Sequence, residues 1–283
     1  GGGIIEVLVT PIVEACPTEN KTAETGLLHS FYCWGVVGVI LLSTLFLNFA
    51  GQANWRLLTC LWALIPAANA VYFGFVPICQ LNDECEGMKL RELFSHSIFW
   101  LLFLMMLTAG ASELSINQWS SAFAESALGV SKTIGDIAGP CFIAIMQGIA
   151  RILYSRFGHK VDLLTLVIGS SALCIVSYLI VSLSPNPVLA SAGCGLCGLS
   201  VGILWPCVLN IAPMKLPRGG TAMFGFLAIA GDAGGSAGPT FVGMIAGAFG
   251  DNISVGLCCA VIFPILLIVV TSLCKKVTKK QNI

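Results

Sequence analysis

One stretch constrains this chain more than any other: a long apolar run whose farther half turns polar. Residues 98–107 are all apolar, and residues 110–119 then add Glu113, Asn117 and Gln118. A helix that crosses about 30 Å of hydrocarbon needs about 20 mostly apolar residues, so the stretch predicts a membrane span that carries a carboxyl group. Because an unpaired carboxylate in lipid is costly, we expect its stripe of Gly110, Glu113, Asn117 and Ser121 to face protein or a water-filled cavity.

The rest of the chain is equally apolar. Only 10% of its 283 residues are charged, against about 25% in an ordinary soluble domain. The mean hydropathy of +0.91 indicates an integral membrane protein, and the net charge of zero gives no support for a nucleic-acid partner. The chain starts within an apolar segment that no basic residues precede, so we expect a truncated chain and not a signal peptide.

Apolar segments between short polar loops predict an all-α polytopic fold with nine membrane spans. The expected spans are residues 1–16, 27–49, 56–79, 94–123, 133–155, 162–183, 187–211, 219–247 and 253–274. If the loops alternate, twelve of the 14 Lys and Arg residues lie on one side and only Arg56 and Lys132 on the other. The positive-inside rule then predicts a multi-pass protein of the cell membrane with a cytoplasmic C-terminus.

A weak internal repeat predicts two halves. Three positions recur at an offset of 195 residues, namely Gly3 with Gly198, Pro11 with Pro206 and Phe31 with Phe226. Parallel six-span repeats are a known transporter architecture, so we expect three spans to be missing at the N-terminus. The expected domains are residues 1–80 (three helices of the first half), 81–92 (central cytoplasmic loop), 93–274 (the complete second half) and 275–283 (cytoplasmic tail).

Two glycine-rich stretches lie within the expected spans. The segment 231–239 is too weak a helix former to stand alone, and we expect it to be bent or locally unwound. Gly193, Gly195, Gly198 and Gly202 recur every two to four residues, which predicts close approach of helix backbones. Most of the 13 cysteines lie in apolar runs, and we expect free thiols, no metal site and no cofactor.

Acids within the spans are the main candidates for function. A carboxyl group buried in the membrane can take up a proton on one side and release it on the other, and a carboxylate can accept hydrogen bonds from solute hydroxyls. The alternative is that each acid ties helices together structurally. Amide and indole side chains lie near these acids in the spans. We therefore predict that acids, amides and indoles form a substrate-binding or proton-coupling set: Glu6, Glu113, Asn117, Gln118, Trp119, Gln147, Trp205, Asn210 and Asp232.

Basic residues end the fifth expected span. Arg151, Arg156 and Lys160 are predicted to lie at the cytoplasmic surface. Their ordinary role is positive-inside anchoring. A sharper hypothesis is that these basic side chains form a gating latch by binding carbonyls or an acid such as Asp162. The latch would break as the two halves rock.

These motifs resemble those of the Major Facilitator Superfamily, and within it of the fucose permease-like proton symporters. The likeness is carried by Gly1-x-Gly3-x-x-Glu6-x-x-x-x-Pro11, Gly110-Ala111-Ser112-Glu113, Arg151 with the Arg156-to-Lys160 turn, Trp205-Pro206, and Gly234-Gly235 with Pro239. The resemblance implies twelve helices, of which nine are present here, alternating access, and sugar uptake driven by protons. It also implies that Glu6 is the fourth-helix carboxylate of substrate binding or coupling, and that Glu113 faces the cavity.

The sequence thus predicts a secondary active transporter, and not an enzyme, that takes up a sugar or related polyhydroxylated solute with protons. We expect it to be a monomer in the lipid bilayer. Two alternatives stay open: efflux of an amphipathic small molecule, and a membrane receptor that does not transport. An enzyme would need a clustered nucleophile and base or a metal-ligand motif, and the three scattered histidines do not supply one.

Overall fold

The computed structural model is built from helices alone in the part of the chain that it describes, which is residues 9, 12–13, 20–76 and 88–281. The principal helices are α2 (Lys21–Ala50), α3 (Trp55–Phe73), α4 (Leu90–Ser95), α5 (Ser97–Leu128), α6 (Lys132–Asp136), α7 (Phe142–Phe157), α8 (Leu163–Leu183), α9 (Pro187–Val201), α10 (Leu204–Lys215), α11 (Gly220–Ala248), α12 (Ile253–Cys259) and α13 (Ile262–Gln281). Short η1 (Gln52–Asn54), η2 (Ile137–Cys141) and η3 (Gly158–Lys160) join some of them.

The predicted all-α membrane fold is confirmed. Seven of the described helical segments are long and apolar enough to cross a membrane. Helix α11 has 29 residues, which is long enough to cross a membrane, but it is not one of these seven segments. In the described residues, each expected span from 27–49 onward coincides with one to three consecutive helical elements. The first expected span lies outside the described residues.

Local sequence signals set the ends of several helices. Asn20 caps α2 by accepting a hydrogen bond from the Ala23 amide at 3.1 Å. Asn186 caps α9 in the same way, accepting from the Val188 amide at 2.9 Å, and Pro187 follows at the first helical position. Both are favoured ways to begin a helix. Helix α5 ends at Leu128 and is capped by Gly129, whose φ of +65° is unfavourable for residues with a side chain.

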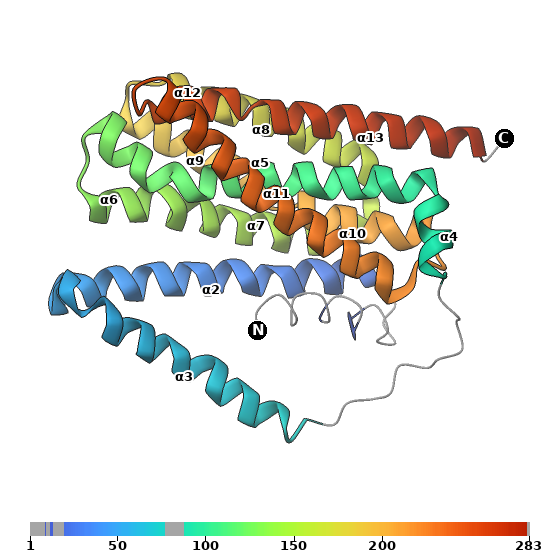
Figure 1. Ribbon diagram of the computed structural model, residues 1–283, viewed down its shortest axis with the longest axis horizontal. Coiled ribbons are helices and arrows are strands. Elements are labelled where there is room, and N and C mark those ends of the chain that lie inside the picture. Colours follow the sequence, from blue (N-terminus) through green and yellow to red (C-terminus); the bar gives the residue numbers. More distant parts are fainter. Residues whose placement is uncertain (1–8, 10–11, 14–19, 77–87, 282–283) are drawn as a thin grey trace.

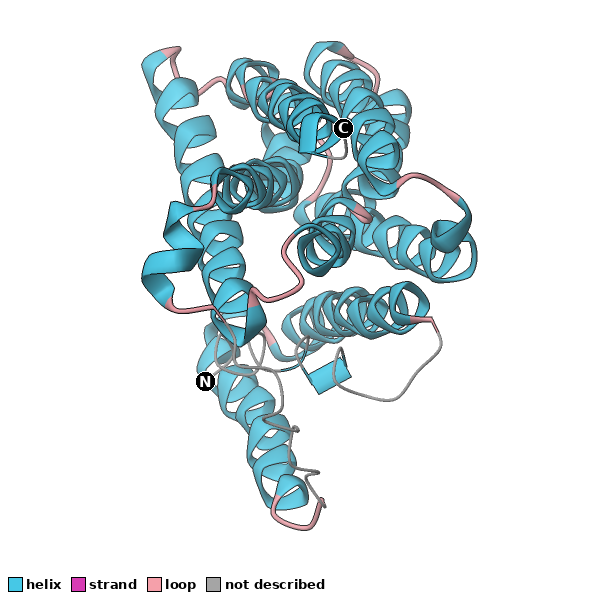
Figure 2. Ribbon diagram, turned by 90° about the vertical axis from the view of Figure 1, so that its right-hand side faces the viewer, coloured by secondary structure: helices cyan, strands magenta, loops and turns pink. Residues whose placement is uncertain are grey.

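Helix α5 lies at the centre of the bundle. It contacts α11 most extensively and also packs against α13, α10, α12 and α9. Helix α2 runs alongside α7 on one flank of the bundle, as Figure 1 shows, and Figure 2 gives the arrangement seen nearly along the helix axes. Groups at the middle of α5 are therefore surrounded by other helices.

Glycines bring α5 and α11 into backbone contact. A Cβ atom added at Gly234 would lie 1.9 Å from the Leu107 carbonyl oxygen, and one at Gly110 would lie 2.2 Å from that of Gly231. We expected residues 231–239 to be bent or locally unwound, and local unwinding is wrong, because α11 is helical from Gly220 to Ala248 with Pro239 inside it. Packing against α5 stabilises a segment that is a weak helix former by itself.

Gly198 of α9 and Gly202, which caps that helix, do the same toward α7. A Cβ atom at Gly198 would lie 2.4 Å from the Ile143 carbonyl oxygen, and one at Gly202 would lie 3.0 Å from backbone atoms of Gln147. The predicted close approach at these glycines is confirmed. The small size of these glycines lets α9 and the turn before α10 pack directly against the middle of α7.

Two prolines interrupt the regular helical pattern. Pro140 lies within η2, a single wide π-type turn between α6 and α7. The second interruption is the turn at Gly202 and Ile203 between α9 and α10, four residues before Pro206. Proline has no N–H to give to the carbonyl one turn earlier, which accounts for the hydrogen bond missing at each break. Pro66, Pro213 and Pro239 nevertheless lie inside continuous helices.

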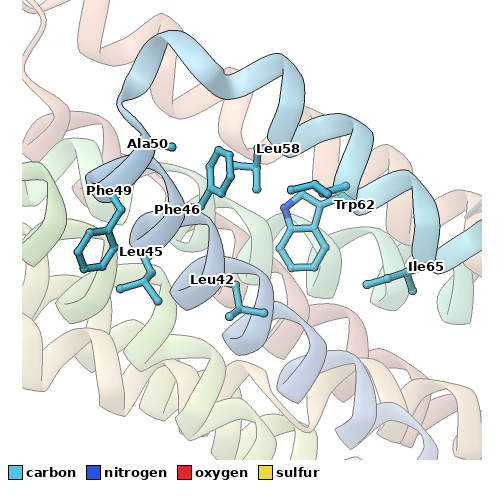
Figure 3. A pocket seen from close by; sticks show the side chains of 9 residues that line it. Leu42, Leu45, Phe46, Phe49, Ala50, Leu58, Trp62 and Ile65 are labelled. Carbon is cyan, nitrogen blue, oxygen red and sulfur yellow. The ribbon is translucent and has the colours of Figure 1, made fainter.

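Helix α3 stands away from the bundle and diverges from α2 (Figure 1). None of its residues is buried. The space between the two helices is an apolar pocket of about 640 Å³, lined by Leu42, Leu45, Phe46, Phe49, Ala50, Leu58, Leu61, Trp62 and Ile65 (Figure 3). An apolar surface of this extent requires hydrocarbon or protein around it.

The α5–α11 contact predicts a large effect of one added methyl group. Gly234→Ala should lower the free energy of unfolding by about 1–3 kcal/mol, because overpacking outweighs the gain in helix propensity. Thermal and denaturant unfolding in detergent would measure this. The matched control is Gly247→Ala in the same helix, where an added Cβ meets nothing within 4 Å and stability should hold or rise. Equal stability of the two variants would contradict the packing assigned to Gly234.

Candidate functional site

A carboxyl group, an amide and a guanidinium meet at the middle of the bundle. The Glu113 Oε1 atom on α5 accepts a hydrogen bond from Gln147 Nε2 at 2.9 Å and another from Arg151 Nη2 at 3.2 Å. Both donors lie on α7, four residues apart, and therefore share one face of that helix. We call Glu113, Gln147 and Arg151 the ionic cluster.

Arg151 also reaches two other helical segments. Its Nε atom donates to the Gly202 carbonyl between α9 and α10 at 2.8 Å, and its Nη1 atom donates to the His29 carbonyl of α2 at 2.9 Å. Its guanidinium carbon lies 5.7 Å from the centre of the Tyr32 ring, also on α2. One side chain therefore joins α2, α5, α7 and the α9–α10 turn.

The Gly202 carbonyl can accept a hydrogen bond from Arg151 because it has no partner within its own helix. In an unbroken helix this carbonyl would accept from the N–H of the residue four positions later. That residue is Pro206, which has no N–H. A guanidinium with fixed, planar donors can satisfy such a carbonyl while it also holds a carboxylate.

The ionic cluster is shielded from solvent. Glu113 is 5% exposed and Arg151 is 3% exposed. Two charges removed from water are tolerated only when they are paired and otherwise hydrogen-bonded, and loss of one partner leaves a costly isolated charge. Two buried polar atoms have no hydrogen-bond partner among the described residues: Oε2 of Glu113 itself and Nε2 of His29 on α2.

The position of Arg151 corrects one expectation. The sequence placed it with the surface residues at the end of the fifth span, but the structure buries it six residues before α7 ends at Phe157. The charge count treats every Lys or Arg near a loop alike, and it cannot see that the Arg151 side chain lies on the same face as Gln147. The gating role itself remains a prediction.

Three further members of the predicted set tie helices together elsewhere. The Trp119 indole nitrogen on α5 donates to the Pro239 carbonyl of α11 at 2.9 Å. The Trp205 ring lies against Gly231, where an added Cβ would come within 2.2 Å of it. Asn210 donates to the Tyr154 hydroxyl at 2.9 Å. The structure thus brings Glu113 and Gln147 together with Arg151 and leaves these three outside the ionic cluster.

The other predicted members are more open. Gln118 and Asp232 are exposed and Asn117 is half-buried, and no side-chain hydrogen bond joins any of the three to the described part of the chain. Glu6 lies outside the described residues. No group of three metal-ligating side chains occurs within residues 20–76 and 88–281, and the ten cysteines described there are free thiols.

At the end of α7, Arg156 and Lys160 are exposed as expected. The proposed latch partner Asp162 is instead bound to α13, because Lys275 Nζ lies 3.0 Å from its Oδ2 atom. Asp162 also accepts from the Thr165 hydroxyl and, at 3.2 Å, from the Thr165 amide. Asp162 therefore caps α8 and holds it to α13.

Several residues of the site escaped sequence reasoning. The sequence allows His29 to be a packed or hydrated histidine or a side-chain ligand, whereas in the structure its backbone carbonyl accepts from Arg151. Tyr32 and Tyr154 gave no pattern that sets them apart from interfacial aromatic residues. The signal that was available is Pro206, because a proline within an apolar span exposes the carbonyl four residues earlier.

The long apolar helices of the bundle define a multi-pass membrane protein with an ionic cluster buried at its centre. The sequence profile of the Major Facilitator Superfamily matches residues 1–239, and the chain belongs to that family. Comparison with curated protein sequences gives no match. Among solved structures, the crystal structure of the E. coli fucose:proton symporter is similar, with a TM-score of 0.72 and 13% identity over 95% of this chain and 73% of that one. At this identity the similarity shows the fold.

The buried pair predicts strong coupling between its members. Glu113→Gln and Arg151→Gln should each lower the free energy of unfolding by about 3–5 kcal/mol, because each leaves an isolated buried charge. The double variant should lose clearly less than the sum. Unfolding of the four proteins in detergent would give the coupling energy.

The exposed pair Arg218–Glu92, with a separation of 2.9 Å, supplies the control. The same double-mutant cycle there should give a coupling energy of less than about 1 kcal/mol. If the losses at Glu113 and Arg151 simply add, the two side chains do not stabilise each other.

The Asp162 contacts predict a pH dependence outside the membrane. The Thr165 hydrogen bonds, and after them Lys275, hold the pKa of the Asp162 carboxyl below its usual value. A depressed pKa adds stability above the unfolded-state value of about 3.9, and that stability is lost as the pH falls through the folded-state value. Unfolding between about pH 6 and 2 should show this loss in the parent protein and less of it in Asp162→Asn. Identical profiles would exclude the contribution.

Proposed function

We propose that the protein is a secondary active transporter that takes up a sugar or related polyhydroxylated solute together with protons. The observation that carries the proposal is the buried Glu113 carboxyl, held on one oxygen by Gln147 and Arg151 while its other oxygen has no partner among the described residues. The family's transport function supports the general class. The fold shared with a fucose:proton symporter supports the choice of solute.

The protonation state of Glu113 determines how strongly it holds the Arg151 guanidinium. As a carboxylate it attracts the guanidinium across 3.2 Å. A proton on Oε2 removes that charge, and Arg151 then keeps only its neutral acceptors, the Gly202 and His29 carbonyls. Since a charge-assisted hydrogen bond is roughly twice as strong as a neutral one, protonation loosens the ionic cluster.

Loosening matters because Arg151 spans the proposed boundary between the two halves. We propose the division at residues 81–92, with α2 in the first half and α5, α7 and α10 in the second. On this division the Arg151–His29 contact links the halves and must break when they rock apart in alternating access. Protonation of Glu113 would thereby be coupled to opening. Glu6, Asn117, Gln118 and Asp232 remain proposed contributors to the solute site, and the C-terminus is proposed to be cytoplasmic.

Uptake into proteoliposomes tests the proposal. With a panel of labelled sugars, we expect accumulation above equilibrium only when the outside is more acidic. Glu113→Gln should abolish that accumulation but keep solute exchange in the absence of a gradient, because the uncharged amide imitates the protonated carboxyl. Retained exchange also shows that the variant is folded.

Glu125→Gln is the matched control, since Glu125 lies on the same helix but pairs with Lys132 at the surface. It should accumulate solute like the parent protein. Normal accumulation by Glu113→Gln would overturn the coupling role. Transport of amphipathic cations or detergent-like solutes in place of sugars would favour the efflux alternative. Binding of a solute without its exchange across the membrane would favour a receptor.

A further inference from the structure

A second pocket opens beside α7, and Ala150 and Tyr154, which flank Arg151 along that helix, help to line it. It has a volume of about 300 Å³ and is lined by Ala150, Leu153, Tyr154, Phe157, Gly158, Val161, Leu166, Leu199 and Ile203. These residues come from α7, η3 and the link after it, α8, α9 and the turn before α10. The volume is at the lower end of small-molecule sites, which run from about 300 to 1,000 Å³.

The pocket has a buried floor and an open mouth. Ala150, Tyr154 and Ile203 are buried, whereas Phe157 is 53% exposed at the other end. The lining is almost wholly apolar, and the Tyr154 hydroxyl is already engaged with Asn210. Such a lining suits a hydrocarbon chain and offers little to a polyhydroxylated solute.

Positive charge stands at the mouth. Lys160 Nζ lies 5.9 Å from the centre of the Phe157 ring, which itself lines the pocket. Arg156, His159 and Lys160 are all exposed on the same turn, and none of them pairs with a carboxylate in the described part of the chain. The nearest acid in sequence, Asp162, is already neutralised by Lys275.

We propose that this pocket is a binding site for an anionic phospholipid. One acyl chain fills the apolar pocket between α7, α8 and α9, and the phosphate lies on the basic turn formed by Arg156, His159 and Lys160. Basic pockets between helices on the membrane side rich in Lys and Arg are suited to anionic headgroups. A zwitterionic lipid could place its chain equally well but would gain less from the three basic side chains.

Native mass spectrometry of the purified protein tests the site. The probe is an equimolar mixture of phosphatidylglycerol and phosphatidylcholine with identical acyl chains, added after delipidation. We expect preferential retention of phosphatidylglycerol. Each of Arg156→Gln and Lys160→Gln should reduce that preference about fivefold, while Lys276→Gln on α13 should leave it unchanged.

A second pair of variants tests the pocket itself. Leu199→Phe fills the space and should reduce the retention of both lipids, whereas Leu189→Phe, at an exposed position of the same helix, should not. If Leu199→Phe does not fold, Val161→Trp at the mouth probes the same space. Equal retention of the two lipids by the parent protein would overturn the headgroup site, and unchanged retention in the filled variant would overturn the pocket.

Discussion

The packing at the centre of this bundle depends on the hydrogen bonds and the ion pair that the Arg151 side chain makes. It satisfies the Glu113 carboxylate, the carbonyl that Pro206 leaves free and a carbonyl of α2. No neutral side chain has enough donors to replace it, and lysine lacks the planar fork that fixes their directions. A buried acid and an interrupted helix, each costly alone, are thus stabilised by one guanidinium.

Close packing makes this arrangement possible. The glycines of α9 bring the α9–α10 turn within reach of α7, and those of α11 let α5 sit deep in the bundle. In hydrocarbon there is no hydrophobic force between helices, so the approach of backbones and a few polar contacts must hold them together. The ionic cluster is one such contact. The Trp119–Pro239 and Tyr178–Ser112 hydrogen bonds are others, both made by side chains to backbone carbonyls.

Much of the fold could be predicted, because a bilayer permits few backbone solutions. Apolar segment length gave the spans, and glycine spacing gave the close contacts of α9. The continuity of α11 could not be predicted, since a propensity argument for residues 231–239 omits the packing of α5 against them. Nor could the pairing within the site. Spacing marked Glu113 and Gln147, but nothing in a linear sequence says that Arg151, six residues from the helix end, turns inward instead of reaching the surface.

The missing bond between the Gly202 carbonyl and position 206 has a mechanical consequence. Where a regular helix resists bending through every one of its ladder bonds, α9 and α10 meet at a joint that already lacks one. Bending α10 against α9 therefore breaks one hydrogen bond fewer than bending a helical segment that contains no proline. Arg151 donates a hydrogen bond to the Gly202 carbonyl at that joint. Loss of this hydrogen bond would therefore also free α10 to move relative to α9.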